Sequence, residues 1–259
     1  MNFTCYVLSL FDEFKRRDSI GAQLKDLSID YEIIDAVDFR RASLDMKLAF
    51  VKKNKMSTIK RELVNGEVGC SLSHFRCYQK LLSSNVDWGL IIEDDADLGR
   101  LKSGYIEDLL SAVASSAVEI DVVILGYSKL AKDNESFFYR LEPIKKLINC
   151  RDFCLGKPWR NWTCGTVSYL ISKTGAEKML NYFSDGKVVT VADDWNFFEK
   201  QVGLNIIHHR PLLVFEDFTN FKSALEPERA KVSKKKTIFL DAIRVLRGYF
   251  RIFLMRFIP

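Results

Sequence analysis

The sequence predicts an α/β fold with a mostly parallel central sheet, and three observations favour it. Apolar segments of strand length alternate with segments of helical periodicity along most of the chain. Two of the apolar segments end abruptly in carboxylates, as strands do where a parallel sheet presents its carboxyl edge to a ligand. With 259 residues, 47% of them hydrophobic, the chain can also bury a substantial core.

The charge is unevenly distributed along the chain, whose formal net charge is +5. Residues 231–259 carry eight Lys or Arg and one Asp, a local charge of +7, which leaves −2 for residues 1–230. A mildly acidic body does not favour a nucleic-acid partner, and we expect none. The chain is therefore divided into a body over residues 1–230 and a basic tail over residues 231–259.

The six cysteines predict reduced thiols and an intracellular protein. They form no C-x-x-C pair, and too few histidines accompany them for an obvious zinc site, although Cys150 and Cys154 leave a metal or disulfide pair open. The amino terminus lacks a basic segment and a cleavage site, so we expect no signal peptide. No run reaches the roughly 18 apolar residues of a membrane span.

The first elements are expected to be a strand at residues 6–10, a helix from Lys15 to Leu24, and a strand at residues 31–37. Arg16 and Arg17 lie on that helix. They either reach a phosphate or base at the sheet edge or belong to a solvated helix face. The polar, basic residues 39–64 indicate a mobile connection or a surface helix.

A glycine- and serine-rich segment, residues 66–74, precedes apolar residues at helical spacing. It predicts a tight loop that leads into a helix, whose first backbone N–H groups can receive an anion. Ser71 or Ser73 is alternatively only the helix cap. His74 is alternatively a packed core imidazole.

The acidic strand end is the most informative motif. Four uncharged residues, 89–92, are followed by four carboxylates in five positions, Glu93, Asp94, Asp95 and Asp97. Carboxylates this close repel one another, and a hard divalent cation such as Mg²⁺ or Mn²⁺ relieves the repulsion. The alternative is a solvated and inert acidic turn.

The second half of the chain continues the alternation, with a helix near residues 106–113, strands at 121–126 and 165–172, and a helix at 173–180. Less regular structure is expected over residues 128–150. Four aromatic residues either stack on sugar rings or bases or fill a second part of the core. They are Phe153, Trp159, Trp162 and Tyr169.

Asp193 and Asp194 repeat the pattern of an apolar run that ends in acids. Either can supply a catalytic base, or one can merely cap the helix that follows. A final strand at residues 204–207 leads to His208, where a neutral imidazole can complete a metal shell or meet a phosphate.

Taken together, these motifs resemble glycosyltransferase family 25, the bacterial lipopolysaccharide and lipooligosaccharide glycosyltransferases related to the collagen galactosyltransferases. The segment 66–74 followed by the Glu-Asp-Asp strand end is the specific part of this resemblance. The remaining matching segments are Leu8-Ser9-Leu10 with Arg16-Arg17, residues 31–38, residues 165–176 and Asp193.

The resemblance implies a GT-A type catalytic domain that uses UDP-galactose or UDP-glucose and Mn²⁺ or Mg²⁺, and that inverts the anomeric centre. The acceptor is then a hydroxyl of a lipopolysaccharide or lipooligosaccharide core. Two departures from the family pattern are Glu93 in place of the first Asp of a D-x-D motif, and Val191-Ala192 where Pro and Val are common.

The motifs and the resemblance together assign the site. The expected general base is Asp193, with Asp194 second, and the expected metal ligands are Asp95, Glu93 and His208. The residues expected to contact the nucleotide sugar are Leu10, Arg16, Arg17, Gly69, Ser73, His74, Glu93 and Asp94.

The tail, residues 231–259, predicts a basic amphipathic helix with Arg244, Arg247 and Arg251 at helical spacing. Such a helix lies in an anionic membrane interface. The alternative is a helix docked on the body or on a second subunit. With a lipooligosaccharide acceptor, the protein is expected at the cytoplasmic face of the bacterial inner membrane, as a peripheral protein.

Two other functions remain open on the sequence. The acidic strand ends also suit a metal-dependent phosphohydrolase or nucleotidyltransferase. A non-catalytic, membrane-peripheral sugar-binding protein is the other alternative.

Overall fold

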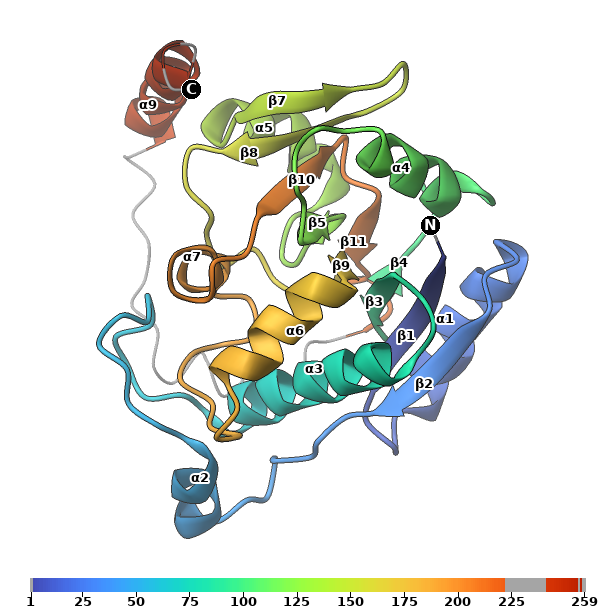
Figure 1. Cartoon of the computed structure of the whole chain (residues 1–259), viewed down its shortest axis with the longest axis vertical. Coiled ribbons are helices and arrows are strands. Elements are labelled where there is room, and N and C mark those ends of the chain that lie inside the picture. Colours follow the sequence, from blue (N-terminus) through green and yellow to red (C-terminus); the bar gives the residue numbers. More distant parts are fainter. Residues whose placement is uncertain (1, 222–240, 256, 258–259) are drawn as a thin grey trace.

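An eight-stranded sheet forms the centre of the computed structural model, which describes residues 2–221, 241–255 and 257 (Figure 1). Its strand order is β2-β1-β3-β9-β5-β10-β8-β7. The bounds are Phe3–Ser9 (β1), Tyr31–Asp35 (β2), Trp88–Glu93 (β3), Val122–Ile124 (β5), Ile144–Asn149 (β7), Cys154–Pro158 (β8), Ser168–Ser172 (β9) and Ile206–Arg210 (β10).

A small second sheet has the order β4-β11-β6. Its strands are Ala96–Asp97 (β4), Gly126–Tyr127 (β6) and Val214–Glu216 (β11). Strand β11 runs antiparallel to β4 and places Glu216 opposite Ala96. This pairing brings the end of β11 beside the acidic end of β3.

Most strands of the central sheet point the same way. Strand β1 is parallel to β2 and β3, and β10 is parallel to β5. Strand β9 is antiparallel to both β3 and β5, and β8 is antiparallel to both β10 and β7. Only β8 and β9 are therefore reversed, and the predicted α/β fold with a mostly parallel sheet is confirmed, in agreement with the expected GT-A type.

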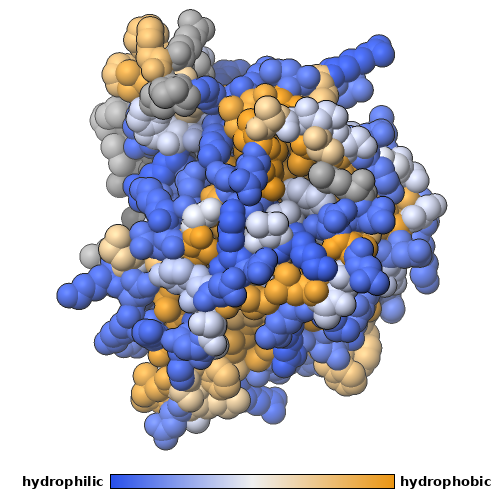
Figure 2. All heavy atoms as spheres, in the orientation of Figure 1, coloured by the Kyte–Doolittle hydropathy of each residue, from blue (hydrophilic) through white to orange (hydrophobic). Residues whose placement is uncertain are grey.

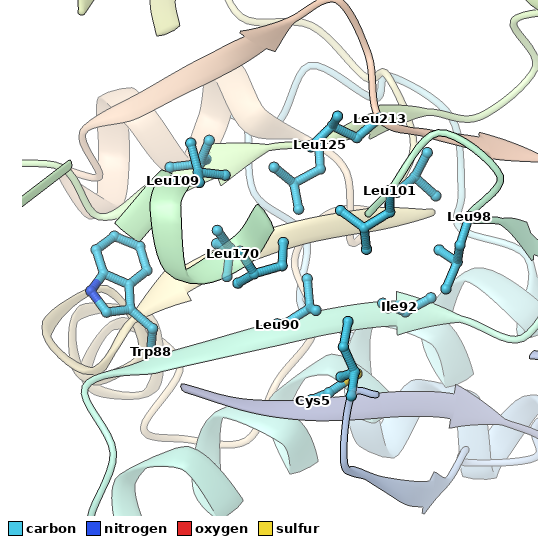
Figure 3. Close-up of a cluster of buried hydrophobic side chains, with 14 of the residues drawn as sticks. Cys5, Trp88, Leu90, Ile92, Leu98, Leu101, Leu109, Leu125, Leu170 and Leu213 are labelled. Carbon is cyan, nitrogen blue, oxygen red and sulfur yellow. The ribbon is translucent and has the colours of Figure 1, made fainter. Parts of the chain in front are cut away.

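Helices cover both faces of this sheet (Figure 1). On one face, α1 and α4 pack on a core that contains Leu90 and Ile92 of β3 (Figure 3). On the other face, α3 and α6 pack on a core that contains Ile91. Alternate residues of β3 thus point to opposite faces, as in any strand, and a continuous apolar run is needed because both faces are buried.

The helices have the following bounds. They are Phe14–Asp26 (α1), Leu44–Phe50 (α2), Asn65–Ser83 (α3), Tyr105–Ala114 (α4), Glu135–Leu141 (α5), Lys173–Tyr182 (α6), Trp195–Phe197 (α7) and Asp241–Met255 (α9), with a 3₁₀ turn at Lys132–Asn134 and a π-helical turn at Phe198–Val202. Within the described residues, none of these helices is long and apolar enough to cross a membrane.

The loop predicted over residues 66–74 is wrong, because α3 already begins at Asn65. The Glu67 carboxylate accepts from the Val64 amide (3.1 Å) and so caps this earlier start. Ser71 and Ser73 lie inside the helix, where each hydroxyl donates to the carbonyl four residues earlier (3.0 and 2.6 Å). Their own amide groups belong to the helix interior and cannot receive an anion.

Two other expectations need correction. Strand β10 extends to Arg210, so His208 lies within the strand rather than in a loop after it. The segment 128–150 is more regular than predicted, since it contains α5 and β7.

Candidate active site

A cavity of about 440 Å³ opens where β1 and β3 end, beside the first turns of α3. This is the carboxyl edge of the parallel strands, where the sequence predicted a ligand site. The volume falls within the usual range for small-molecule sites. The predicted residues that line it are Leu10, Arg16, Ser73, His74, Glu93, Asp94, Asp95 and Asp193.

Arg16 joins two of the predicted acids. Its Nη1 lies 3.0 Å from Asp94 Oδ1 and 3.0 Å from Asp95 Oδ2. The Ser9 hydroxyl donates to the other Asp94 oxygen (2.6 Å). Asp94 is thus held by β1 and α1 at once, and Arg16 supplies a positive charge in the cavity wall.

Asp95 is a cavity acid whose pKa is strongly raised. Burial is the main cause, and the negative charges of Glu93 and Glu216 add to it, so that the pKa of Asp95 rises to about 8 although Arg16 opposes the shift. Its Oδ1 is buried and has no hydrogen-bond partner. A carboxylate in this position either keeps a proton at neutral pH or pairs with a further cation. These observations fit the divalent cation that the sequence predicted.

Glu216 is a cavity residue that the sequence reasoning missed. It ends β11, and its Oε2 accepts from the Lys129 amide (3.0 Å). The signal was present in the sequence, because the apolar run 212–215 also ends in two acids, Glu216 and Asp217. The sequence alone could not predict that Glu216 lies near Asp95, since the two are brought together by the pairing of β11 with β4.

Glu93 and His74 face one another across the cavity wall. The Thr166 hydroxyl donates to Glu93 Oε1, and His74 Nε2 lies 3.8 Å from the same oxygen, beyond hydrogen-bonding distance. His74 Nδ1 is 2.7 Å from the Tyr169 hydroxyl. His74 is therefore both buried, as the core alternative required, and part of the cavity wall.

The structure separates the two candidate bases. Asp193 lines the cavity, and its Oδ2 accepts from the Gly165 amide (2.8 Å). Asp194 is fully buried and caps α7, while its carboxylate also accepts from the Thr58 amide (3.0 Å) and the Thr190 hydroxyl (2.5 Å). Of the two, only Asp193 is placed to meet a substrate.

His208 does not fit the expected metal shell. It is fully buried outside the cavity wall, with Nδ1 2.6 Å from the Tyr127 hydroxyl and Nε2 2.7 Å from Asn161 Oδ1. Both ring nitrogens are therefore engaged. Burial, and then the charge of Arg210, hold the pKa of His208 well below its usual range.

Arg17 and Gly69 also lie outside the cavity wall. Arg17 donates to Asp35 (2.6 Å) and to the Ser9 carbonyl (3.1 Å), so it links α1 to the ends of β1 and β2. A Cβ at Gly69 would lie 2.5 Å from the Val37 carbonyl oxygen. This glycine is needed for close packing of α3, and neither residue fits the expected contact with a nucleotide sugar.

Three of the four predicted aromatic residues pack in or against the core, whereas Trp159 is 39% exposed. Phe153 stacks on His209 and Trp162 stacks on His208, with centroids 5.0 and 5.2 Å apart. Tyr169 is fully buried. Among the described residues that line the cavity, none is one of the four predicted aromatics. Their positions therefore do not support stacking on a sugar bound in the cavity.

The raised pKa of Asp95 predicts a pH-dependent stability. Between about pH 4 and 8 the unfolded chain loses the Asp95 proton while the folded chain keeps it, so stability falls as the pH rises. Asp95→Asn removes this fall. In the absence of divalent cations we expect its free energy of unfolding, relative to the unmodified protein, to rise by about 2–5 kcal/mol from pH 4 to pH 8.

Urea unfolding across this pH range measures the effect. Asp97→Asn is the matched control because, despite partial burial, hydrogen bonds from Lys132 and Gly99 lower the pKa of Asp97, so it titrates below this window. A difference between Asp95→Asn and the unmodified protein that stays constant from pH 4 to 8 would contradict the prediction.

Comparisons with known proteins agree with the motifs. Residues 2–195 match the family model described as "Glycosyltransferase family 25 (LPS biosynthesis protein)". The chain is 26% identical over 190 residues to "Procollagen galactosyltransferase 1-B" of Xenopus laevis, which covers 72% of this chain and 29% of that protein. It therefore spans less than a third of the length of this relative.

A second relative matches over more of its length. The chain is 26% identical over 257 residues to a "Putative glycosyltransferase" of Haemophilus influenzae, covering 92% of this chain and 82% of that protein. Among solved structures, "a glycosyltransferase involved in the glycosylation of the major capsid of PBCV-1" aligns with 96% of this chain and 100% of its own, at 10% identity and a TM-score of 0.42.

Proposed function

This chain belongs to glycosyltransferase family 25, and from that premise we propose that it transfers galactose or glucose from a UDP-sugar to an acceptor hydroxyl, with inversion of the anomeric centre. The single observation that carries the proposal is the cavity at the carboxyl edge of β1 and β3, whose wall contains both Asp95 and Asp193. One acid suits a cation beside the diphosphate, and the other suits a base beside the acceptor.

The residues that would hold a divalent cation are Asp95, Glu93 and Glu216. The fit rests on the unpartnered, buried Asp95 Oδ1 and on the raised pKa of Asp95, whose main cause is burial and to which the negative charges of Glu93 and Glu216 add. When bound, Mn²⁺ or Mg²⁺ supplies positive charge against the negative charge that develops on the departing diphosphate. Arg16 contributes a further positive charge from the same wall and holds Asp94 and Asp95 in place.

Asp193 is the proposed general base. The acceptor oxygen forms a bond to the anomeric carbon, the bond from that carbon to the UDP oxygen breaks, and the hydroxyl proton passes to the Asp193 carboxylate. The hydrogen bond from the Gly165 amide orients this carboxylate. Gly165 has φ = +87°, in the region that favours glycine, and the Ser128 side chain leaves no room for a Cβ there.

Release of UDP from UDP-galactose and UDP-glucose tests the proposal. With Mn²⁺, we expect release from one of the two donors to increase when a lipooligosaccharide core acceptor is added. Release of inorganic phosphate that does not depend on an acceptor would instead support the phosphohydrolase alternative. No release under any condition would support the non-catalytic sugar-binding alternative.

The C-terminal helix α9 supports a proposed membrane contact. One side packs on the body, where Arg251 pairs with Glu142 (2.8 Å). On the same side Gly248 approaches the Arg140 carbonyl oxygen so closely that a Cβ at Gly248 would lie 2.1 Å from it. One side of α9 is therefore docked on the body, as the alternative to membrane binding expected. Residues 231–240, including the three consecutive lysines, lie outside the described residues.

The other side of α9 is apolar and exposed at the edge of the molecule (Figure 2). Tyr249, Phe250 and Phe253 are between 53% and 59% exposed, and Arg247 is exposed beside them. Aromatic and basic side chains on one surface suit an anionic lipid interface. We propose peripheral binding to the cytoplasmic face of the bacterial inner membrane, where a lipid-linked acceptor is within reach.

The double substitution Phe250→Glu with Phe253→Glu tests this contact. We expect it to reduce binding to vesicles that contain phosphatidylglycerol at least tenfold, an effect of about 1.4 kcal/mol or more, since two exposed apolar groups that the lipid would cover are replaced by two negative charges. Co-sedimentation measures it. Val118→Glu, at an exposed apolar position in the loop after α4, is the control, and equal binding of all three proteins would exclude α9 as the membrane contact.

A further inference from the structure

Three potential metal ligands converge in the cavity wall on the α3 side. Cys70 and His74 are four residues apart on α3, so both side chains lie on the same face of the helix. Glu93 reaches the same place from the end of β3. One ligand atom from each of the three lies within 4.8 Å of the other two.

This spacing is close to that of a bound tetrahedral cation. Ligand atoms bonded to Zn²⁺ at about 2.0–2.3 Å are about 3.3–3.7 Å apart in a tetrahedral site. His74 Nε2 and Glu93 Oε1 are 3.8 Å apart. Small side-chain rotations therefore suffice to close the three ligands around an ion.

One nitrogen of the His74 ring has no hydrogen-bond partner. His74 is 1% exposed, and its Nε2 is a buried atom without a hydrogen bond. Nδ1 lies 2.7 Å from the Tyr169 hydroxyl, which is itself 2.8 Å from the Tyr78 hydroxyl. When Nδ1 carries the proton and donates to Tyr169, Nε2 presents a lone pair toward Glu93 and Cys70, as a metal-ligating histidine does.

We propose that Cys70, His74 and Glu93 form a binding site for Zn²⁺ or a similar borderline-soft divalent cation. Thiolate and imidazole ligands favour such ions, whereas Mg²⁺ and Mn²⁺ prefer the carboxylates around Asp95. Three protein ligands with a fourth position open to the cavity make an open zinc site. On binding, Cys70 loses its thiol proton to solvent.

The shared ligand Glu93 couples this site to the proposed transfer reaction. A carboxylate oriented toward Zn²⁺ at Cys70 and His74 is withdrawn from the cation and donor beside Asp95. Zn²⁺ bound here therefore competes with productive donor binding. This consequence rests on the proposed function, while the cation site itself rests only on the geometry.

Cobalt provides a direct test of the site. Co²⁺ replaces Zn²⁺ with the same ligands, and a thiolate ligand gives a sulfur-to-cobalt charge-transfer band in the near ultraviolet. We expect the full chain under reducing conditions to show this band with one equivalent of Co²⁺ and to lose it when Zn²⁺ is added. Cys70→Ser should lose the band, and Cys150→Ser, a change at an exposed cysteine, should keep it.

Three results bear on the proposal. Weaker Co²⁺ binding in Glu93→Gln with the band retained would support it, since the thiolate is present and one oxygen ligand is weakened. A band that persists in Cys70→Ser, or Co²⁺ binding by the unmodified protein without a band, would overturn it. Circular dichroism of each variant shows that loss of the band is not loss of the fold.

Transfer assays test the coupling separately. Micromolar Zn²⁺ in excess Mn²⁺ should lower UDP release by the unmodified protein at least tenfold, and Cys70→Ser should lose most of this inhibition relative to its own uninhibited rate. A cobalt band in a protein with no transfer under any condition supports the zinc site and counts against the proposed function. Transfer with no cobalt band supports the proposed function and counts against the zinc site.

Discussion

Asp95→Asn is expected to lower hexose transfer roughly a hundredfold or more while the protein remains folded. The neutral amide keeps the size of the carboxylate but removes the negative charge that a divalent cation needs. It also removes a buried carboxylate that, when ionised, is repelled by the negative charges of Glu93 and Glu216. The same substitution therefore removes the loss of stability between pH 4 and pH 8 and impairs transfer, as expected where an unfavourably buried charge serves function.

The measurement is kcat/KM for the donor as a function of Mn²⁺ concentration. Asp97→Asn is the matched control, because Asp97 belongs to the same acidic run but pairs with Lys132 outside the cavity wall. We expect the Asp97 variant to stay within a few-fold of the unmodified protein. Near-normal turnover of Asp95→Asn would remove Asp95 from the proposed cation site.

Asp193→Asn is expected to have an effect of similar size, roughly a hundredfold or more on kcat, with little effect on donor binding. Asparagine can still accept from the Gly165 amide through its side-chain oxygen, so the local structure is retained. It cannot take the acceptor proton.

Asp194→Asn distinguishes a base from a helix cap. Its carboxylate accepts several hydrogen bonds in a fully buried place, so the variant should lose about 2–4 kcal/mol of stability. Measured at a temperature where it is folded, it should transfer at a rate close to normal. If Asp193→Asn retained turnover while Asp194→Asn lost it, the proposed assignment of the base would be reversed.

The fold class was predictable because its signals are local. Apolar runs buried on both faces, helical periodicity and acidic strand ends all occupy short windows of sequence. The start of α3 was missed for a local reason as well. Gly66 and Gly69 indicated a loop, but Gly69 serves the close approach of α3 to the Val37 carbonyl, and the packing of α3 outweighs the low helix propensity of glycine.

The sequence predicted which kinds of residue form the candidate site better than it predicted which individual residues belong to it. Asp95, Glu93 and Asp193 follow apolar runs, and all three line one cavity. His208 belonged to the same kind of pattern but lies inside β10, where hydrogen bonds to Tyr127 and Asn161 occupy both nitrogens. A sequence shows that a polar residue follows an apolar run, but it does not show where the strand ends or what lies opposite.

By itself, the sequence determined an α/β chain with acids at the ends of its strands and an amphipathic basic tail. Only the tertiary structure decided that Asp193 rather than Asp194 faces the cavity, that Glu216 joins Asp95, and that Cys70 and His74 converge on Glu93. The physical reason is the range of the interactions. Helical periodicity and an apolar run followed by acids involve only neighbouring residues, whereas burial, charge repulsion and an unpartnered nitrogen depend on atoms brought together from distant parts of the chain.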